Sequence, residues 1–514
     1  MYTIKDLVRR AKSVNARRPA TISAEETVTW AEFHDRIQAM AGALVEQGLK
    51  KGDRVAILAL NSARQFEFWY AVLWAGGIVA PQNFRFAPRE ILHCLQDLDG
   101  IWICTDKACL PTIEEIRPVV PGVRGLFYIG DGECPPDYVR YEALRKGDGS
   151  AVVDEPLVND PAMIYYTGGT TGVSKGVLFT HAQILSAAQQ WAAGIRSMHA
   201  ADTYLHVAPM FHMGDGVMCY VTAMKTCCNA FIDKYDLKRF IDICNRDGVS
   251  WSTMVPTMVR SLCLHVQETG VQLPTLRGVV YGGAPMPPAV LDMAMQTFPG
   301  LEFWQGYGAT EAQSIAVLES KLHTLDERGQ RLLRSAGRPF HSVLIGILDE
   351  QGDEVPHGTV GEICIRSNAV MQEYWRKPEM TRHALRGNWY HTGDAGYLDE
   401  EGFVYIVDRV KDMIITGGEN VYSSEVENVL FTHPDIAEAA VIGLPHEKWG
   451  EAVHAVVLCK QGRTVRDEEL ILYCRDYLAG YKIPKSYTFV NEPLPRTSIG
   501  KVRKETLRES FSVR

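Results

Sequence analysis

Short apolar runs rich in β-branched residues alternate with longer stretches of helical spacing through the region before Ser342. The apolar residues of 181–195, 237–246 and 288–298 recur every three or four positions, as on one face of a helix. This alternation predicts α/β layers with largely parallel sheets. The runs between such stretches have the length of strands, and we predict strands at 54–60, 101–105, 162–166, 203–207, 252–255, 278–281 and 301–304.

The first strong helix signal is the capping box Thr29-Trp-Ala-Glu32, which predicts a helix from there through Leu49. From Ser342 the strands become shorter, at 342–350, 360–367 and 403–408, and this spacing predicts an antiparallel sheet or a small barrel. About a hundred residues follow Asp408, with strands and two helices that begin at the sequences 424–427 and 464–467.

We therefore predict an α/β fold with a large N-terminal domain at 1–408, which ends in a small β-barrel-like subdomain. A hinge at 409–411 and a small α+β C-terminal domain at 412–514 complete the predicted organisation.

A chain of 514 residues exceeds what one core usually supports, and 46% apolar and 22% charged residues are ordinary for a globular protein. A net charge of −9 without Lys/Arg blocks argues against nucleic acid as the main partner. No apolar run is long enough to span a bilayer, and the N-terminus lacks an apolar signal core, although its arginines leave a transit peptide as a minor alternative. Twelve cysteines without a CxxC pair indicate reduced core thiols and a cytoplasmic location.

Residues 166–176 read YTGGTTGVSKG, in which three glycines and four hydroxyl side chains precede Lys175. Glycines permit close backbone approach, and N–H groups, hydroxyls and an ammonium together suit a polyphosphate. The spacing differs from the P-loop pattern G-x-x-x-x-G-K-[ST], so we interpret the segment as another kind of nucleotide-phosphate loop. An ordinary Gly/Thr turn is the alternative for this segment alone.

Five further segments accompany this loop: YGGAP (281–285), QGYGATE (305–311), YHTGD (390–394), DRVKDMIITGGENVYSSEVE (408–427) and PRTSIGK (495–501). Together, and in this order, they resemble the adenylate-forming superfamily, which contains acyl-CoA synthetases, adenylation domains of peptide synthetases and beetle luciferases. The resemblance extends over nearly the whole chain.

The resemblance implies ATP and Mg²⁺ as ligands. Tyr307 is expected to stack on adenine, Thr310 to contact the α-phosphate, and Glu311 to ligate the metal, since Mg²⁺ needs only one or two carboxylates beside phosphate oxygens. Asp394 is expected to bind both ribose hydroxyls, and Arg409 a ribose or phosphate oxygen. The remaining nucleotide residues implied are Thr167, Thr170, Thr171 and Lys175 in the phosphate loop and Gly282, Gly283 and Ala284 beside the base.

The resemblance also implies residues for the two half-reactions. Lys501 is expected to bridge the substrate carboxylate and the α-phosphate, and Lys411 takes the hinge position. His212 matches a residue between the acyl pocket and the thiol tunnel; nearby, Asp215 departs from the family pattern and is either a helix cap or a contact to a polar substrate group. For coenzyme A, the implied residues are Gly417, Gly418 and Trp449.

We expect an AMP-forming acyl-CoA synthetase that activates a medium- or long-chain fatty acid or an aryl acid, because an amino-acid-binding F-D-x-S segment and a carrier-protein site are lacking. The alternatives are an adenylation enzyme that loads another acceptor, luciferase-like oxidation, and a non-enzymatic binding protein. The expected partners are the acid, ATP and CoA, in a monomer or homodimer. The residues proposed around the acyl slot are Tyr204, Met210, His212, Met213, Val255, Gly283 and Trp304.

Overall fold

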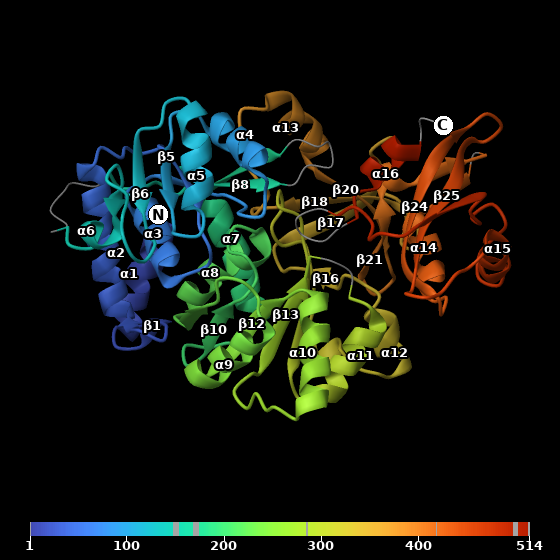
Figure 1. Ribbon diagram of the computed structural model, residues 1–514, viewed down its shortest axis with the longest axis horizontal. Coiled ribbons are helices and arrows are strands. Elements are labelled where there is room, and N and C mark those ends of the chain that lie inside the picture. Colours follow the sequence, from blue (N-terminus) through green and yellow to red (C-terminus); the bar gives the residue numbers. More distant parts are fainter. Residues whose placement is uncertain are drawn as a thin grey trace. The chain divides into compact units, whose positions relative to one another are not determined.

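The computed structural model describes residues 2–147, 154–167, 174–283, 286–417, 419–496 and 502–511. It confirms the mixed α/β layers, and the chain divides into two compact units (Figure 1). The first unit holds most of the chain up to Leu344 together with Arg366–Tyr390, and the second holds Ile345–Ile365 and His391–Arg514. The predicted domain boundary at 409–411 stays a prediction.

The first unit contains two large sheets whose central strands are parallel. One comprises β1 (Pro19–Ile22), β2 (Thr27–Thr29), β10 (Thr203–His206), β11 (Cys228–Phe231), β12 (Val249–Met254), β13 (Gly278–Gly282), β14 (Glu302–Tyr307), β15 (Ala316–Leu318) and β16 (Arg338–Pro339). Its order is β16-β15-β14-β13-β12-β10-β11-β1-β2, with parallel pairing from β14 through β1 and antiparallel pairing toward both edges.

The other sheet comprises β3 (Arg54–Leu58), β4 (Ile78–Pro81), β5 (Trp102–Thr105), β6 (Gly125–Tyr128), β7 (Val139–Arg140), β8 (Pro161–Thr167), β9 (Lys175–Thr180) and β19 (Glu373–Tyr374). Its order is β19-β9-β8-β4-β3-β5-β6-β7. β8 and β9 form an antiparallel hairpin, so the predicted phosphate loop connects two strands at one end of this sheet.

Helices cover these sheets, which explains why a strand such as β12 is buried at every position. Phe240, Leu262 and Leu291 pack from three helices onto Val279 and Phe303 of the nine-stranded sheet. The helices of the first unit are α1 (Ile4–Asn15), α2 (Trp30–Glu46), α3 (Ala63–Trp74), α4 (Pro88–Leu98), α5 (Leu110–Ile116), α6 (Tyr141–Leu144), α7 (His181–Gly194), α8 (Met213–Lys225), α9 (Leu237–Asp247), α10 (Pro256–Thr269), α11 (Pro288–Thr297), α12 (Glu327–Leu332) and α13 (Pro378–Ala384).

The capping box at Thr29 is confirmed: its side chain accepts from the Glu32 N–H, and the Glu32 carboxylate accepts from the Thr29 N–H at 2.8 Å. The helix ends at Glu46 rather than at the predicted Leu49. Gly48, with φ of +99°, turns the chain out of the helical conformation there.

The second unit begins with a four-stranded sheet in the order β17-β18-β20-β21. Of the two predicted alternatives, a sheet and a small barrel, the sheet is therefore correct. A second sheet follows, in which β24 and β25 form a long antiparallel hairpin and β26 pairs parallel to β25. The elements are β17 (Val343–Leu348), β18 (Gly361–Ser367), β20 (Tyr390–Leu398), β21 (Val404–Arg409), β22 (Ile414–Thr416), β23 (Glu419–Val421), β24 (Ile436–His446), β25 (Gly450–Cys459), β26 (Ser486–Val490), α14 (Ser423–Phe431), α15 (Asp467–Arg475) and α16 (Lys504–Phe511).

Both predicted helices of this unit are present, but the predicted cap at Ser424 is wrong because Ser424 lies inside its helix. Helix α14 begins at Ser423, and Asp408 caps it from a distance by accepting from the Ser423 hydroxyl at 2.6 Å and from the Ser424 N–H at 3.2 Å. Helix α15 begins at Asp467, three residues after Thr464. The third helix, α16, was not predicted.

None of the twelve cysteines, all of which lie in the described part of the chain, forms a disulfide, as expected for thiols. Among the described residues, no helix has the length and apolar character needed to cross a membrane.

Candidate active site

The β8–β9 hairpin positions the first predicted nucleotide residues. Thr167, the last residue of β8, lies opposite Lys175, the first residue of β9, and this pair closes the loop on the strand side. Lys175 is partly exposed, and its Nζ lies 5.0 Å from the centre of the Tyr374 ring. The hairpin therefore holds the base of the lysine side chain on a strand that is paired on both sides, while the ammonium lies over an aromatic face.

Tyr374 also binds Glu311, the predicted metal ligand. Its hydroxyl donates to Glu311 Oε1 at 2.8 Å, and the Glu311 carbonyl accepts from the Met371 N–H at 2.7 Å. Burial, and then the charge of Glu311, raises the pKa of Tyr374, so the phenol remains a donor. A partly exposed carboxylate fixed in this way fits the oxygen ligand that Mg²⁺ prefers.

The predicted adenine-binding segments lie at the ends of adjacent parallel strands, β13 and β14, where open α/β sheets bind ligands. Gly282 lies opposite Gly306, and a Cβ at Gly282 would lie 2.5 Å from the Gly306 carbonyl oxygen, so a side chain is excluded there. Gly283 follows with φ of +76°. Tyr307 ends β14, and Thr310 is partly exposed three residues later.

His212 occupies the N-cap of α8, where its Nδ1 accepts from the Gly214 N–H at 3.2 Å. The helix-cap alternative for Asp215 is therefore wrong. Asp215 is fully buried and accepts from the Tyr204 hydroxyl at 2.7 Å, while its second oxygen lies 2.8 Å from His206 Nδ1. Both carboxylate oxygens are thus used inside the core, and Tyr204 belongs to this polar network.

In the second unit, Asp394 and Arg409 lie opposite each other on β20 and β21 and form an ion pair with Nε–Oδ1 of 2.8 Å. Gly393, with φ of +70°, makes the turn before the carboxylate, and Thr392 Oγ1 accepts from the Asp394 N–H at 3.0 Å. The pair places a largely buried carboxylate beside a half-exposed guanidinium, which is a suitable arrangement for a ribose next to a phosphate.

The residues predicted for CoA also meet. The Gly417 N–H donates to the Trp449 carbonyl at 2.8 Å, and a Cβ at Gly417 would lie 3.6 Å from the indole, at φ of +63°. Trp449 stacks on His446 with ring centres 4.2 Å apart. Lys448 Nζ and Lys485 Nζ lie 5.9 and 5.8 Å from the indole ring. A partly exposed indole with two ammonium groups within 6 Å of its ring centre suits a phosphorylated nucleoside.

Lys411 lies in the short 3₁₀ turn Val410–Asp412 directly after β21, and Asp412 is paired with Arg508 at 2.8 Å. The hinge role of Lys411 stays a prediction, as do all the ligand roles above. The predicted residues Thr170, Thr171, Ala284, Gly418 and Lys501 lie outside the described residues.

Three residues with contacts at these places were not predicted: Tyr374, Lys448 and Lys485. No motif marks Tyr374, which is far from both Lys175 and Glu311 in sequence and is placed by the pairing of β19 with β9. A search for lysines close to Trp449 in sequence would have found Lys448, whereas Lys485 lies beyond one strand and one helix, β25 and α15.

Comparison with known proteins agrees with this geometry. The family model described as AMP-binding enzyme matches residues 8–375, and that described as AMP-binding enzyme C-terminal domain matches residues 425–501. The chain is 34% identical to a long-chain-fatty-acid–CoA ligase of Mycobacterium tuberculosis, over 100% of this chain and 99% of that protein. It is 32% identical to a fatty acid–[acyl-carrier-protein] ligase of Streptomyces coeruleorubidus, over 96% and 93% of the two chains.

Among solved structures, o-succinylbenzoate CoA synthetase from Bacillus subtilis, in complex with its acyl-adenylate intermediate, is similar with a TM-score of 0.83 and 29% identity. That likeness covers 98% of this chain and 97% of the other. With the Lys175–Tyr374–Glu311 contacts and the Asp394–Arg409 pair in place, the motif resemblance is confirmed. The chain belongs to the AMP-binding enzymes of the adenylate-forming superfamily, in its acyl-CoA synthetase family.

Proposed function

We propose that this protein activates a medium- or long-chain fatty acid or an aryl carboxylic acid with ATP and transfers the acyl group to coenzyme A. The observation that carries the proposal is that Tyr374 holds the predicted metal ligand Glu311 and contacts the predicted phosphate-loop Lys175. These two charged groups are the ones that a Mg²⁺–polyphosphate requires, and they come from separate motifs.

In the proposed first step, a carboxylate oxygen of the acid attacks the α-phosphorus of ATP, the bond to the β-phosphate breaks, and pyrophosphate leaves. Bound Mg²⁺ would neutralise phosphate charge beside Glu311. Lys175 stabilises the departing phosphates, and Thr310 orients the α-phosphate. Lys501, by resemblance, offsets the repulsion between the two approaching anions.

In the second step, the CoA thiolate attacks the acyl carbon and AMP leaves. The face formed by Trp449, Lys448 and Lys485 supports CoA as the acceptor, because CoA carries an adenine and several phosphates. A carrier protein presents the same pantetheine thiol but has no adenosine, so it has no base that could stack on Trp449. Transfer to a carrier protein is the second candidate, favoured by the similarity to the Streptomyces enzyme.

The side chains around the proposed acyl slot favour an apolar acid. Met210 and Met213 are buried beside His212 at the start of α8, and the Asp215 carboxylate is bound within the core. Each methylene that enters such a slot contributes about 0.8 kcal/mol, or roughly fourfold in specificity, until the slot is full.

The test supplies ATP, Mg²⁺ and CoA with acetate, octanoate, palmitate, benzoate and ferulate, and measures AMP, pyrophosphate and thioester. We expect AMP and thioester in equal amounts, with octanoate or an aromatic acid preferred over acetate. If acetate is converted as efficiently as octanoate and the aromatic acids, the proposed class of apolar acids is wrong. Pyrophosphate release without thioester, followed by acylation of an added holo-carrier protein, would favour the second candidate.

The domain division, with a hinge at 409–411, and a monomeric or homodimeric state are part of the proposal. Twelve cysteines without a disulfide support a reducing compartment such as the cytoplasm.

A further inference from the structure

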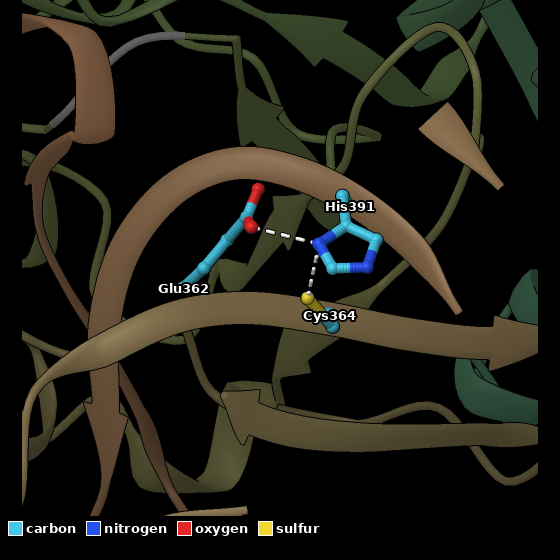
Figure 2. Close-up of side chains that lie close together, drawn as sticks. All are labelled: Glu362, Cys364 and His391. Carbon is cyan, nitrogen blue, oxygen red and sulfur yellow. Dashed lines mark hydrogen bonds and ion pairs between the residues drawn. The ribbon is translucent and has the colours of Figure 1, made fainter. Parts of the chain in front are cut away.

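Three side chains with different donor atoms converge in the four-stranded sheet of the second unit (Figure 2). Glu362 and Cys364 are two residues apart on β18, so their side chains point to the same face of the sheet. His391 comes from the neighbouring strand β20. His391 Nδ1 lies 2.7 Å from Glu362 Oε2 and 3.2 Å from Cys364 Sγ, and the donor atoms of all three lie within 4.8 Å of one another.

One ring nitrogen, His391 Nδ1, faces both partners. With a proton on Nδ1, His391 donates to the carboxylate, and Cys364 Sγ, a weak acceptor, receives only a shared part of that bond. Without that proton, Nδ1 accepts from the thiol but faces carboxylate lone pairs. A cation at the centre of the three donors would attract all of them.

We propose that Glu362, Cys364 and His391 form a binding site for a thiophilic divalent ion of the Zn²⁺ type. Thiolate, imidazole and carboxylate are the donors that Zn²⁺ takes, whereas Mg²⁺ and Ca²⁺ prefer oxygen ligands alone. This site is therefore chemically distinct from the oxygen site that Glu311 provides for the nucleotide metal.

The dimensions fit such an ion. Zinc bonds of about 2.0–2.3 Å in a tetrahedron place neighbouring donor atoms about 3.3–3.7 Å apart. The two separations from His391 Nδ1, 2.7 and 3.2 Å, have to open by about half an ångström. The Glu362–Cys364 separation, at most 4.8 Å, has to close toward that range, and the side-chain torsions of Glu362 allow both movements.

The burial of the three side chains also fits. Cys364 is buried, and the side chains of His391 and Glu362 are 9% and 19% exposed, so an ion could enter from the Glu362 side and keep a water as fourth ligand. Glu362 Oε1 accepts from the Gly393 N–H at 3.0 Å, which orients the carboxylate while Oε2 faces the site.

The full-length protein, stripped of metal with EDTA and dialysed, is titrated with Co²⁺ as a spectroscopic substitute for Zn²⁺. We expect one Co²⁺ per chain, a sulfur-to-cobalt charge-transfer band, and loss of that band when Zn²⁺ is added. Cys364→Ser should remove the band. Glu362→Gln should keep it while weakening Co²⁺ binding by at least about tenfold, the lower end of what loss of even an outer partner costs.

Cys134 and Cys459 are the partly exposed thiols of the chain, so the double variant Cys134→Ser/Cys459→Ser is the matched control and should keep the band. Folding of every variant is checked by thermal unfolding. If Cys364→Ser does not fold, His391→Gln takes its place with the same expected loss. A folded wild type without the band, or a band that persists in Cys364→Ser or His391→Gln, would overturn the site.

Discussion

The Tyr374 hydroxyl donates to Glu311 Oε1 at 2.8 Å, and the same ring lies 5.0 Å from Lys175 Nζ. The aromatic side chain thus connects a residue of the QGYGATE segment with the lysine that ends the phosphate loop. The pairing of β19 with β9 holds Tyr374 beside the strand of Lys175, and the bond from the Met371 N–H to the Glu311 carbonyl holds Glu311 near the same segment.

Removing the Tyr374 hydroxyl should raise the Mg²⁺ concentration that adenylation requires. In Tyr374→Phe the ring over Lys175 remains, but Glu311 loses a hydrogen bond worth about 1.5–3 kcal/mol when one partner is charged. Since Glu311 is partly exposed, we expect the lower end, or about a tenfold increase in the Mg²⁺ concentration for half-maximal adenylation. Mg²⁺ titration of pyrophosphate release measures this. Tyr235→Phe, which removes a hydroxyl bound to Ser261, is the control; equal Mg²⁺ dependence in both variants would contradict the role.

Asp394 should determine recognition of the ribose. In Asp394→Ala, loss of a charged acceptor should raise KM for ATP by about tenfold to a hundredfold and leave KM for the acid nearly unchanged. The wild type should also prefer ATP over 2′-deoxy-ATP, and the variant should lose this preference. Glu400→Gln, an exposed charge in the turn between β20 and β21, is the control. A preference for ATP that survives in Asp394→Ala would remove the assignment.

Trp449 should matter only for an acceptor that carries adenosine. Alanine substitution at a stacking platform costs about 1–3 kcal/mol per base, so Trp449→Ala should raise KM for CoA by about five- to 150-fold. KM for pantetheine should not change, because pantetheine has no base to stack. Tyr477→Ala, at an exposed aromatic residue of the same unit, is the control. Equal effects on both thiols would indicate a structural role.

His323 should make the protein less stable in acid. Burial lowers the pKa of His323 to about 4, below its ordinary value of 6.5. The ring is held with Nε2 2.9 Å from the Tyr281 hydroxyl and Nδ1 3.1 Å from the Glu319 carbonyl, an arrangement that suits a neutral tautomer. The unfolded chain therefore binds a proton that the folded chain lacks, and this contribution to stability is complete above about pH 6.5 and is lost as the pH falls toward 4.

The slope of the unfolding free energy in that window should be shallower in His323→Gln, by up to about 1.4 kcal/mol per pH unit. Urea unfolding at several pH values measures it, with the exposed His383→Gln as control. Parallel slopes in wild type and His323→Gln would exclude this linkage.

The sequence predicts the fold of the first unit well because its strands are buried on both faces and read as continuous apolar runs. β12 and β13 are of this kind. The prediction missed several others, among them the short central strands β4, β6 and β11. The hairpin strand β9 was also missed, since its pairing with β8 and β19 depends on the tertiary structure and not on the local pattern.

Contacts between distant residues explain the other errors. Nothing local to Ser424 indicates that Asp408, sixteen residues earlier, caps α14. Asp215 lies in a segment that suggests a cap, yet its partners are Tyr204 and His206 on β10. Helix α16 was missed because Leu507 is its one buried residue among those described, which leaves almost no apolar periodicity.

The Asp408 cap of α14 lies directly beside the proposed hinge. Asp408 directly precedes the proposed hinge at 409–411, and it holds Ser423 and Ser424 on the far side of that hinge. Lys504 of α16 forms an ion pair with Glu427 of α14, with 2.7 Å between Nζ and Oε1. If the chain rotates at Lys411 as proposed, the Asp408 bonds have to break, so we expect them to act as a latch that favours the present arrangement.

Proline at 411 fixes φ and should trap one arrangement. We expect Lys411→Pro to retain one half-reaction, adenylation by the family resemblance, and to lose most of thioester formation; Lys411→Ala, which leaves the backbone free, should support both. Lys501→Ala should lose adenylation but still convert supplied acyl-adenylate and CoA.

Ser423→Ala weakens the latch by one hydrogen bond to a carboxylate, about 1.5–3 kcal/mol, and should change the ratio of the two rates without abolishing either. Both half-reactions are measured separately in each variant, and a uniform slowing of the two steps by every substitution would refute the two-orientation mechanism.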